Sequence, residues 1–191
     1  KQNKIYIYGK HAVAEALSNA PQAVKKVYLS PKQEDQHVRA LIKRTGVAVS
    51  ELGKDRPPGV DADTTHQGVI GVVSLEDLMR PMKSFLADLK ITDDTAVVLL
   101  GEIQDPHNVG AVIRSAAAFG VAGVLIPEHN QAPVTGAVVK VSAGMAFRVP
   151  LVQIGNINQA VRDLKEAGFT VYGLEGGGNA TTTDEAYDGP S

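Results

Sequence analysis

The chain has 191 residues and a mass of 20.1 kDa, and 43% of its residues are hydrophobic, which is enough for a sizeable core in one large or two small domains. It contains no cysteine, which excludes disulfides, thiolate nucleophiles and sulfur-ligated zinc sites. No apolar run approaches the roughly 18 residues that a membrane span needs, and the first residues lack the apolar core of a signal peptide. We therefore expect a cytoplasmic protein with no membrane partner.

The net charge of −2 hides an asymmetry along the chain. Residues 1–93 hold 14 basic and 11 acidic side chains, whereas residues 94–191 hold 5 and 10, so the two halves carry +3 and −5. The first 44 residues are the most basic, with 9 lysines and arginines against 3 acidic residues. This balance fits a phosphate-bearing partner that docks on the first part of the chain, although lysines that only solubilise helix surfaces would give the same count.

The first part of the chain is predicted to form one α/β unit. The hydrophobic pattern predicts a strand at 4–8, a helix at 9–19, a strand at 23–30, a helix at 34–46 and strands at 47–52 and 67–74. Val13, Ala16 and Leu17 form the apolar stripe of the first helix, and Gly46 is placed to end the second. The polar loop at 53–67 is long, which favours a functional or mobile segment over ordinary packing.

Residues 75–94 are predicted as a linker, because they combine Pro81 with several charges and only a weak helical pattern. After it, strands and helices alternate, which is typical of a parallel sheet with helices on its faces. The predicted elements are a strand at 95–102, a helix at 108–119, a strand at 121–127, a helix near 133–144, a strand at 147–154, a helix at 156–168 and a strand at 169–175. A sheet of four strands that ends in a polar, glycine-rich loop would be incomplete.

The predicted helix at 108–119 carries Arg114 at the flank of a buried face. That apolar face consists of Val109, Val112, Ile113, Ala116 and Ala117. Asn108 is suited to cap the start of this helix and Gly120 its end, so each polar residue has a structural explanation of its own. However, a helix that begins at the carboxyl end of a parallel strand directs free N–H groups into the crevice where α/β folds bind ligands. Asn108 and Arg114 could jointly hold a phosphodiester there.

Other chemistries have less support in the sequence. No GxGxxG or P-loop pattern is present, so the crevice is not expected to bind a dinucleotide or a nucleoside triphosphate. His66, His107 and His129 lie in separate loops without metal-ligand spacing, and we expect no metal. Glu102 and Asp105 could act as a carboxylate pair, but Asp105 is better explained as the start of an Asp-Pro turn.

The segment DPHNVGAVIRSAAAFG at 105–120 resembles the first signature of the SpoU family of RNA 2'-O-ribose methyltransferases, N-x-G-x-x-x-R-[ST]-A. The matching residues are Asn108, Gly110, Arg114, Ser115 and Ala116. YGKHAVAEAL at 8–17 and HQGVIGVV at 66–73 resemble the start and the last strand of the family's RNA-binding domain, and KVSAGMAFRVPLV at 140–152 resembles a further family segment. Within the family, the chain resembles the bacterial enzymes that methylate a guanosine ribose of large-subunit (23S) ribosomal RNA.

The resemblance implies a fold and a set of partners. An α/β RNA-binding domain of ribosomal-protein-like type at 1–74 would be joined by the linker at 75–94 to a parallel-sheet methyltransferase domain at 95–191, with a trefoil knot of the SPOUT type. The family implies a homodimer, an RNA substrate and S-adenosylmethionine as the methyl donor. Two further family signatures would follow Ser191, so the C-terminal part of the methyltransferase domain is expected to be missing from this chain.

The resemblance also assigns roles to residues. Asn108 would position the site, and Arg114 would act on the ribose 2'-hydroxyl, by orientation and electrostatic stabilisation because an arginine keeps its proton at neutral pH. Leu174 and Gly176 would approach the cofactor, although a flexible glycine loop explains their segment as well. The RNA-binding residues expected in the first domain are Lys10, His11, Lys25, Lys26, His66 and Gln67.

Three alternatives remain open. The first is a non-catalytic RNA-binding protein of the same fold, and the second is a SpoU-type methyltransferase that acts on tRNA. The third is a flavodoxin-like domain that binds a small anion, with the basic first unit serving a protein partner. Binding of RNA and of S-adenosylmethionine would separate the enzyme from an RNA-binding protein and from the flavodoxin-like domain.

Overall fold

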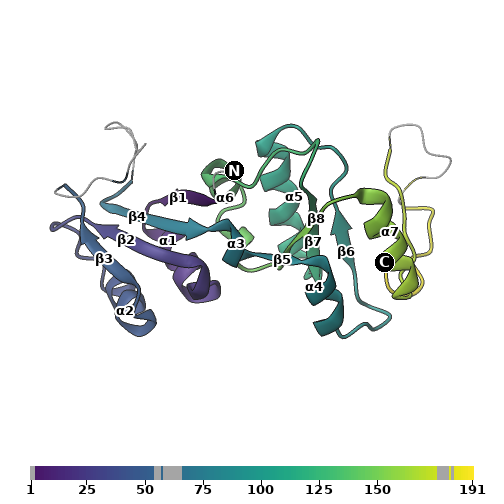
Figure 1. The fold of residues 1–191 in the computed structure, drawn as a ribbon, viewed down its shortest axis with the longest axis horizontal. Helices are drawn as coiled ribbons and strands as arrows, with labels where there is room; N and C mark the ends of the chain where they lie inside the picture. The colour runs from purple at the N-terminus through teal and green to yellow at the C-terminus, as the bar shows by residue number, and fades with distance from the viewer. Residues whose placement is uncertain (1–2, 54–56, 58–65, 176–180, 182) are drawn as a thin grey trace.

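Two four-stranded sheets follow one another along the long axis of the protein, as the computed structural model shows (Figure 1). The structure describes residues 3–53, 57, 66–175, 181 and 183–191. Most of the loop predicted at 53–67 therefore lies outside the described residues. Within the described ranges, no helix has both the length and the apolar character needed to cross a membrane.

The first sheet is mixed and has the strand order β1-β4-β2-β3. Its strands are β1 (Lys4–Tyr8), β2 (Val24–Leu29), β3 (Ala48–Glu51) and β4 (Val69–Ser74). β4 runs antiparallel to both β1 and β2, whereas β3 is parallel to β2. The helices of this part are α1 (Lys10–Asn19), the 3₁₀ turn η1 (Pro21–Ala23) and α2 (Gln36–Thr45). Each helix and strand predicted for this part of the chain is present.

The two faces of the first sheet differ because side chains alternate along each strand. On β1, Ile5 and Ile7 point into the main hydrophobic cluster, where the predicted stripe of α1 is also fully buried. Tyr6 and Tyr8 point to the opposite face and pack with Tyr28 of β2 and the apolar residues of β4. That face therefore carries three tyrosines.

The second sheet is parallel throughout and has the order β5-β8-β7-β6. Its strands are β5 (Met79–Pro81), β6 (Val97–Leu99), β7 (Gly123–Pro127) and β8 (Leu151–Ile154). The remaining elements are α3 (Leu75–Leu78), α4 (Met82–Asp88), α5 (Pro106–Ala118), α6 (Gly136–Val141), the 3₁₀ turn η2 (Met145–Phe147) and α7 (Ile157–Glu166).

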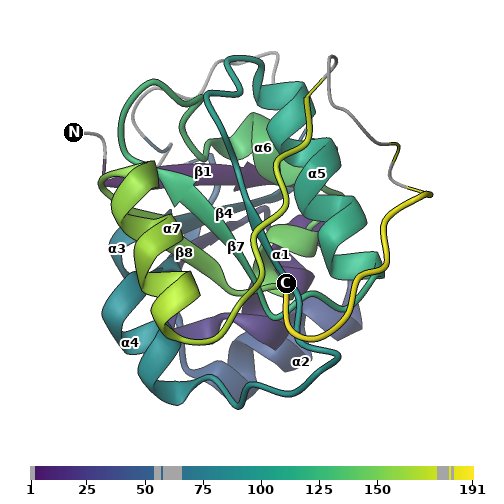
Figure 2. The same cartoon turned by 90° about the vertical axis from the view of Figure 1, so that its right-hand side faces the viewer.

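Helices cover both faces of the second sheet (Figure 2). Val124 packs with the buried residues of α5 and α6 in one hydrophobic cluster, whereas the next residue, Leu125, packs with those of α4 and α7 in another. The alternating strand residues thus separate α5 and α6 on one face from α4 and α7 on the other. The architecture agrees with the predicted α/β class.

Two features of this part differ from the sequence-based expectation. The predicted linker at 75–94 contains β5, which pairs with β8, and α4, whose Phe85 is buried against the second sheet. The predicted strand at 169–175 is not a strand. Thr170 instead donates to the carbonyl of Pro190, and the backbone of Ser191 exchanges hydrogen bonds with Thr95 and Val97 beside β6. The edge position that the predicted strand would need is therefore occupied at this point by the backbone of Ser191.

The two sheets are joined by shared packing. The main hydrophobic cluster includes residues of α1 and β1 as well as residues of α5, α6 and η2. α6 lies between β1 and α5 (Figure 1) and contacts both. The first turn of α6 approaches β1 so closely that a Cβ atom on Gly136 would collide with the carbonyl oxygen of Tyr6. The first part of the chain is thus held against the helices of the second.

Candidate functional site

The helix α5 begins two residues earlier than predicted, and Asn108 is not its cap. Asp105 is the N-cap, and its Oδ1 accepts a hydrogen bond from the backbone N–H of His107 at 2.8 Å. Pro106 occupies the first helical position, where its missing N–H costs nothing and its fixed φ suits a helix. The prediction of Asn108 as the cap is wrong, and its side chain is not needed to start the helix.

The other end of α5 is as predicted. Gly120 has a φ of +72°, a left-handed conformation that glycine adopts without steric cost. Its N–H donates to the carbonyl of Ala117 at 3.3 Å, and the N–H of Val121 donates to that of Ala116 at 3.1 Å. This pair of bonds is the Schellman arrangement, which satisfies carbonyls at the end of a helix.

Asn108 and Arg114 both lie on the exposed face of α5. Within the described part of the chain, neither side chain has a hydrogen bond or an ion pair. The two positions are six residues apart, which places them about 9 Å apart along the helix axis and about 120° apart around it. They lie toward opposite edges of the exposed face, and their joint hold on one phosphodiester stays a prediction.

Gly110 sets how closely α5 packs on α6. A Cβ atom at this position would lie 2.7 Å from Cβ of Val141 and 3.0 Å from the carbonyl oxygen of Val138. Only glycine fits between the two helices without a shift of backbone or side chain. Gly110 therefore fixes the position of the exposed face that carries Asn108 and Arg114.

The loops that follow β6 and β7 are bound to each other at the carboxyl edge of the second sheet. The side-chain amide of Gln131 pairs with the backbone of Ile103, accepting from its N–H and donating to its carbonyl, both at 2.9 Å. Gln104 donates to the carbonyl of Asn130 at 2.7 Å. These glutamines carry no signal in a single sequence, because a loop glutamine is most simply explained as a solvated side chain. They fix the loop from which α5 begins.

The predicted cofactor residues are not brought into an enclosed site by the described residues. Leu174 is 78% exposed and follows α7, which covers the face of the sheet opposite to α5. Gly176 lies outside the described residues. Within the described part of the chain, no hydrogen bond or hydrophobic cluster joins Leu174 to Asn108 or Arg114.

Four of the predicted RNA-binding residues gather at one end of the first sheet. Gln67 accepts a hydrogen bond from the backbone N–H of Lys10 at 3.4 Å, and Nδ1 of His66 accepts one from Gly68 at 3.0 Å. His11 follows Lys10 on the first turn of α1 and is exposed. The Lys10 ammonium lies 3.4 Å from Asp35, so its charge is partly compensated.

The other two predicted residues lie at the opposite end of the first sheet, near the start of β2. The ammonium of Lys25 forms an ion pair with Asp77 at 3.1 Å. The pKa of Asp77 is held below its ordinary value, mainly by the hydroxyl of Ser74 and also by Lys25. Lys26 lies over the ring of Tyr28, 4.6 Å from its centroid. The six predicted residues thus form two separate groups.

In the described ranges, no group of three or more histidine, cysteine or carboxylate side chains is arranged to hold a metal ion. His107 lies on the first turn of α5, and His129 lies in the loop after β7. His66 uses its ring nitrogen to support the turn before β4. The exposed face of α5 remains the candidate site.

Family models match both parts of the chain. The model described as the SpoU rRNA Methylase family matches residues 95–190, and the model for RNA 2'-O ribose methyltransferase substrate binding matches residues 6–78. The chain belongs to the SpoU rRNA methylase family. The first of these models covers α5 with Asn108 and Arg114, and the second covers the first sheet with its basic helices.

Relatives and solved structures agree with this membership. The 23S rRNA (guanosine-2'-O-)-methyltransferase RlmB of Xanthomonas axonopodis pv. citri is 33% identical over 184 residues, which cover 95% of this chain and 74% of the relative. The RlmB protein of Nitrosomonas europaea is 32% identical, over 88% of this chain and 65% of its own length. The crystal structure of an rRNA methyltransferase from Sinorhizobium meliloti has the same fold, with a TM-score of 0.65 at 22% identity, over 87% of this chain and 60% of that one.

Proposed function

We propose that this SpoU family protein transfers a methyl group from S-adenosylmethionine to a ribose 2'-hydroxyl of RNA, and that the substrate is a guanosine of 23S ribosomal RNA. The proposal rests on the exposure of two residues of the family signature. Asn108 and Arg114 lie on one exposed face of α5, and within the described residues neither side chain is engaged by another protein group. Such side chains are available to a substrate.

Relatives support the choice of substrate and methyl donor. The relatives from Xanthomonas and Nitrosomonas are named as methyltransferases of a 23S rRNA guanosine, whereas a relative from Mycoplasma pneumoniae is named only as a tRNA/rRNA methyltransferase. A structure of the Sinorhizobium meliloti protein is described as bound to AdoMet. These names favour ribosomal RNA over tRNA as the substrate.

In the proposed reaction, the protein itself forms no covalent bond with the substrate. The methyl group of S-adenosylmethionine is already activated as a sulfonium, so the enzyme must mainly align the ribose hydroxyl and ease the loss of its proton. Arg114 offers a planar fork of donors that suits a phosphate or a developing oxyanion next to the hydroxyl. Asn108, nearer the start of α5, would hold another part of the nucleotide. Arg114 is proposed to orient and stabilise, and not to abstract the proton.

We also propose, from the family resemblance, a homodimer in the cytoplasm whose catalytic domain contains a trefoil knot. The domain limits proposed are 1–74, 75–94 and 95–191, with β5 of the middle segment forming an edge strand of the second sheet and α4 packed on that sheet. Light scattering with size-exclusion chromatography tests the dimer directly. A single species with the mass of one chain, at the concentration used for activity, would refute it.

The test of function is transfer of a labelled methyl group from S-adenosylmethionine to a 23S rRNA transcript, with the intact mass of the protein checked. Arg114→Ala should lower the rate by roughly 100-fold, the cost of losing one electrostatic stabiliser, with RNA affinity nearly unchanged. Arg162→Ala is the matched control, because Arg162 is an exposed helical arginine on α7. Resistance of the labelled linkage to alkali would place the methyl group on the 2'-oxygen.

Two results would count against the proposal. RNA binding without any methyl transfer would leave a non-catalytic RNA-binding protein of this family. Transfer that is equally fast in Arg114→Ala would keep the enzyme but remove the role of Arg114. A tRNA transcript assayed in parallel identifies the substrate class, since faster methylation of tRNA would overturn the choice of ribosomal RNA.

A further inference from the structure

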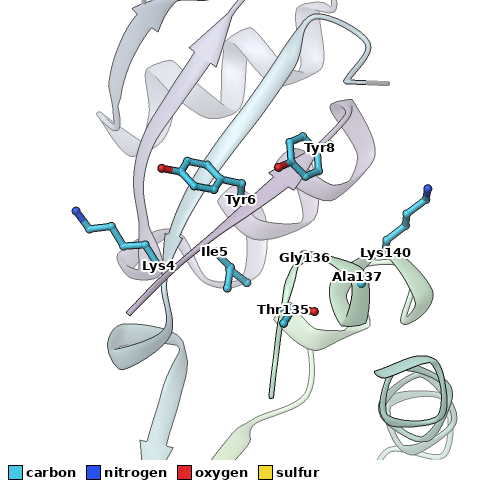
Figure 3. Close-up of a pocket in the computed structure, with 8 residues that line it drawn as sticks. All are labelled: Lys4, Ile5, Tyr6, Tyr8, Thr135, Gly136, Ala137 and Lys140. Atoms are coloured by element: carbon cyan, nitrogen blue, oxygen red, sulfur yellow. The ribbon is translucent and has the colours of Figure 1, made fainter. Parts of the chain in front are cut away.

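A cleft of about 480 Å³ lies where the first sheet meets α6 (Figure 3). β1 contributes Lys4, Tyr6 and Tyr8, whereas Thr135 is the N-cap of α6 and Lys140 lies in its last turn. Its volume is within the roughly 300–1,000 Å³ that ligand pockets usually occupy. The cleft is separate from the exposed face of α5 described above.

The shape of the cleft follows from the packing of α6 on β1. The absence of a side chain at Gly136 lets the first turn of α6 touch the backbone of β1 at Tyr6. The tyrosine rings stand on the outer face of the first sheet, where they are only partly buried. Figure 3 shows the two rings on the same side of β1, with Lys4 to one side of them and Lys140 to the other. Aromatic surface and positive charge therefore meet in one place.

The electrostatic character of the cleft is positive. Lys4 and Lys140 have no ion pair with any described residue, unlike Lys10 and Lys25. Among the described residues that line the cleft, none is a carboxylate. Two uncompensated ammonium groups beside two tyrosine rings are suited to a ligand that is both anionic and rich in flat π surfaces.

We propose that this cleft binds a single-stranded segment of the RNA substrate, with bases against the rings of Tyr6 and Tyr8 and phosphates at Lys4 and Lys140. The inference rests on the proposed function, because it assumes that the partner is RNA. Unpaired bases are recognised by stacking on aromatic side chains, whereas the grooves of duplex RNA offer few such surfaces. An acidic peptide would satisfy the lysines but would not use the tyrosines.

The position of the cleft fits this role. α6 lies between β1 and α5 (Figure 1), and α5 carries Asn108 and Arg114 on its exposed face. A single-stranded RNA segment bound at β1 would therefore be separated from the candidate catalytic residues only by α6. The cleft would anchor RNA next to the target nucleotide, and would give the first sheet a direct part in presenting the substrate.

The test is the affinity of the protein for a fluorescently labelled, single-stranded fragment of 23S rRNA, measured by anisotropy over a range of salt concentrations. Lys4→Gln and Lys140→Gln should each reduce the slope of log K against log salt by about 0.7, the value for one phosphate contact on a single strand. Tyr6→Leu keeps an apolar side chain and should lower affinity by roughly 5-fold to 100-fold with the slope unchanged.

Lys83→Gln removes an exposed lysine of α4, outside the cleft, and should change neither affinity nor slope. Thermal unfolding of each variant shows that it is folded. Wild-type affinity and slope in the folded Lys4→Gln and Lys140→Gln variants would overturn the proposal. Competition by a polyglutamate peptide as strong as that by unlabelled RNA would also overturn it.

Failure of this inference can be told apart from failure of the proposed function. If the wild-type protein binds RNA through the cleft but transfers no methyl group, the proposed function fails and the cleft stands. If methyl transfer occurs and the cleft variants bind RNA normally, the cleft fails alone. A duplex version of the same fragment should bind more weakly than the single strand, and equal affinity would contradict recognition of unpaired bases.

Discussion

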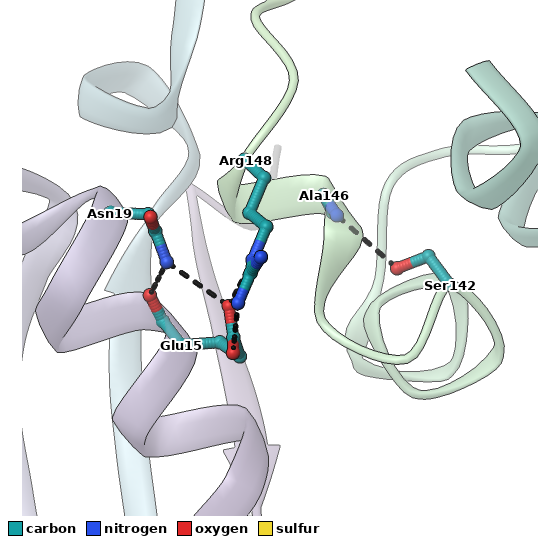
Figure 4. A network of polar contacts seen from close by, with 5 residues as sticks. All are labelled: Glu15, Asn19, Ser142, Ala146 and Arg148. Carbon is teal, nitrogen blue, oxygen red and sulfur yellow. Dashed lines mark hydrogen bonds and ion pairs between the residues drawn. The ribbon is translucent and has the colours of Figure 1, made fainter. Parts of the chain in front are cut away.

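Arg148 and Glu15, which are 133 positions apart in the chain, form an ion pair with two hydrogen bonds (Figure 4). Nε of Arg148 donates to Oε2 of Glu15 at 2.7 Å, and Nη2 donates to Oε1 at 2.8 Å. The side-chain amide of Asn19 also donates to Oε2, at 3.0 Å. Because Glu15 is on α1 and Arg148 follows η2, this pair joins the first part of the chain to the second.

The turn before Arg148 is held in an unusual conformation against Glu15. Ala143 and Gly144 have positive φ angles of 52° and 80°. The buried hydroxyl of Ser142 donates to the carbonyl of Val139 at 3.0 Å and accepts from the N–H of Ala146 at 3.4 Å. This turn, which belongs to the family segment seen in the sequence, therefore presents Arg148 to α1.

The first prediction is that the contribution of Glu15 to stability depends on pH. Hydrogen bonds from Arg148 are the main cause that holds the pKa of Glu15 below its ordinary value of 4.5, and they outweigh burial, which raises it. A carboxyl group whose pKa is lower in the folded state stabilises the fold above its unfolded pKa, and loses that effect as pH falls through the folded value. Glu15→Gln should therefore lower the free energy of unfolding at neutral pH, and the difference from wild type should shrink below pH 4.5.

Urea unfolding of both proteins, at neutral pH and at steps down through pH 4.5, measures this difference. Glu185→Gln is the control, because Glu185 is exposed and outside any helix. A difference between wild type and Glu15→Gln that stays constant over the whole range would show that the ion pair does not stabilise the fold.

The second prediction separates capping from function at the start of α5. Asp105→Ala removes the N-cap and should destabilise the protein by about 1 kcal/mol. Asn108→Ala should leave the free energy of unfolding within about 0.5 kcal/mol of wild type, because its side chain is exposed and caps nothing. The same Asn108→Ala protein should lose methyl transfer. Thermal unfolding and the methyl-transfer assay, run on both variants, check the pair, and equal destabilisation would mean that Asn108 is structural after all.

The third prediction concerns Gly110. In an open helix, glycine to alanine stabilises by about 1 kcal/mol, but here the new methyl group would overlap Val141 and the carbonyl of Val138. Overpacking of this kind costs about 1–3 kcal/mol, so Gly110→Ala should lower the urea midpoint. Gly155→Ala is the control, since a Cβ atom there meets nothing within 4 Å. A midpoint for Gly110→Ala above that of wild type would show that α5 and α6 are less closely packed than described.

The sequence predicts local features of this fold better than pairing between distant segments. The stripe of α1 and the glycine that ends α2 follow from residues within one element, and both are confirmed. β5 has only three residues and includes Pro81, so it has no pattern of its own and exists through its pairing with β8. Proline is tolerated there because β5 is an edge strand. The segment at 169–175 has strand composition, but the backbone of Ser191 pairs beside β6 instead.

In the candidate site too, features within one helix could be predicted from the sequence, whereas contacts between distant elements could not. The hydrophobic pattern around Asn108 and Arg114 was enough to place both residues on one helix. The first residue of that helix was not predicted, because Asp105 and Pro106, which begin it, can equally form an Asp-Pro turn before a helix. The pair of Glu15 and Arg148 could not be found from the sequence, because each is a charged residue on a solvated face until α1 and η2 pack together. Only the packing of distant elements reveals it.

The last prediction tests whether close contact between α6 and β1 holds the two parts together. A methyl group at position 136 would meet the carbonyl oxygen of Tyr6, and a backbone atom cannot turn away as a side chain can. Gly136→Ala should therefore push α6 from β1, destabilise the protein by about 1–3 kcal/mol and speed amide hydrogen exchange in β1. Gly173→Ala, where a Cβ atom meets nothing within 4 Å, should change neither quantity. If exchange in β1 stays at the wild-type rate in Gly136→Ala, the attachment of the first sheet must come from the remaining contacts, which include the shared hydrophobic cluster and the ion pair between Glu15 and Arg148.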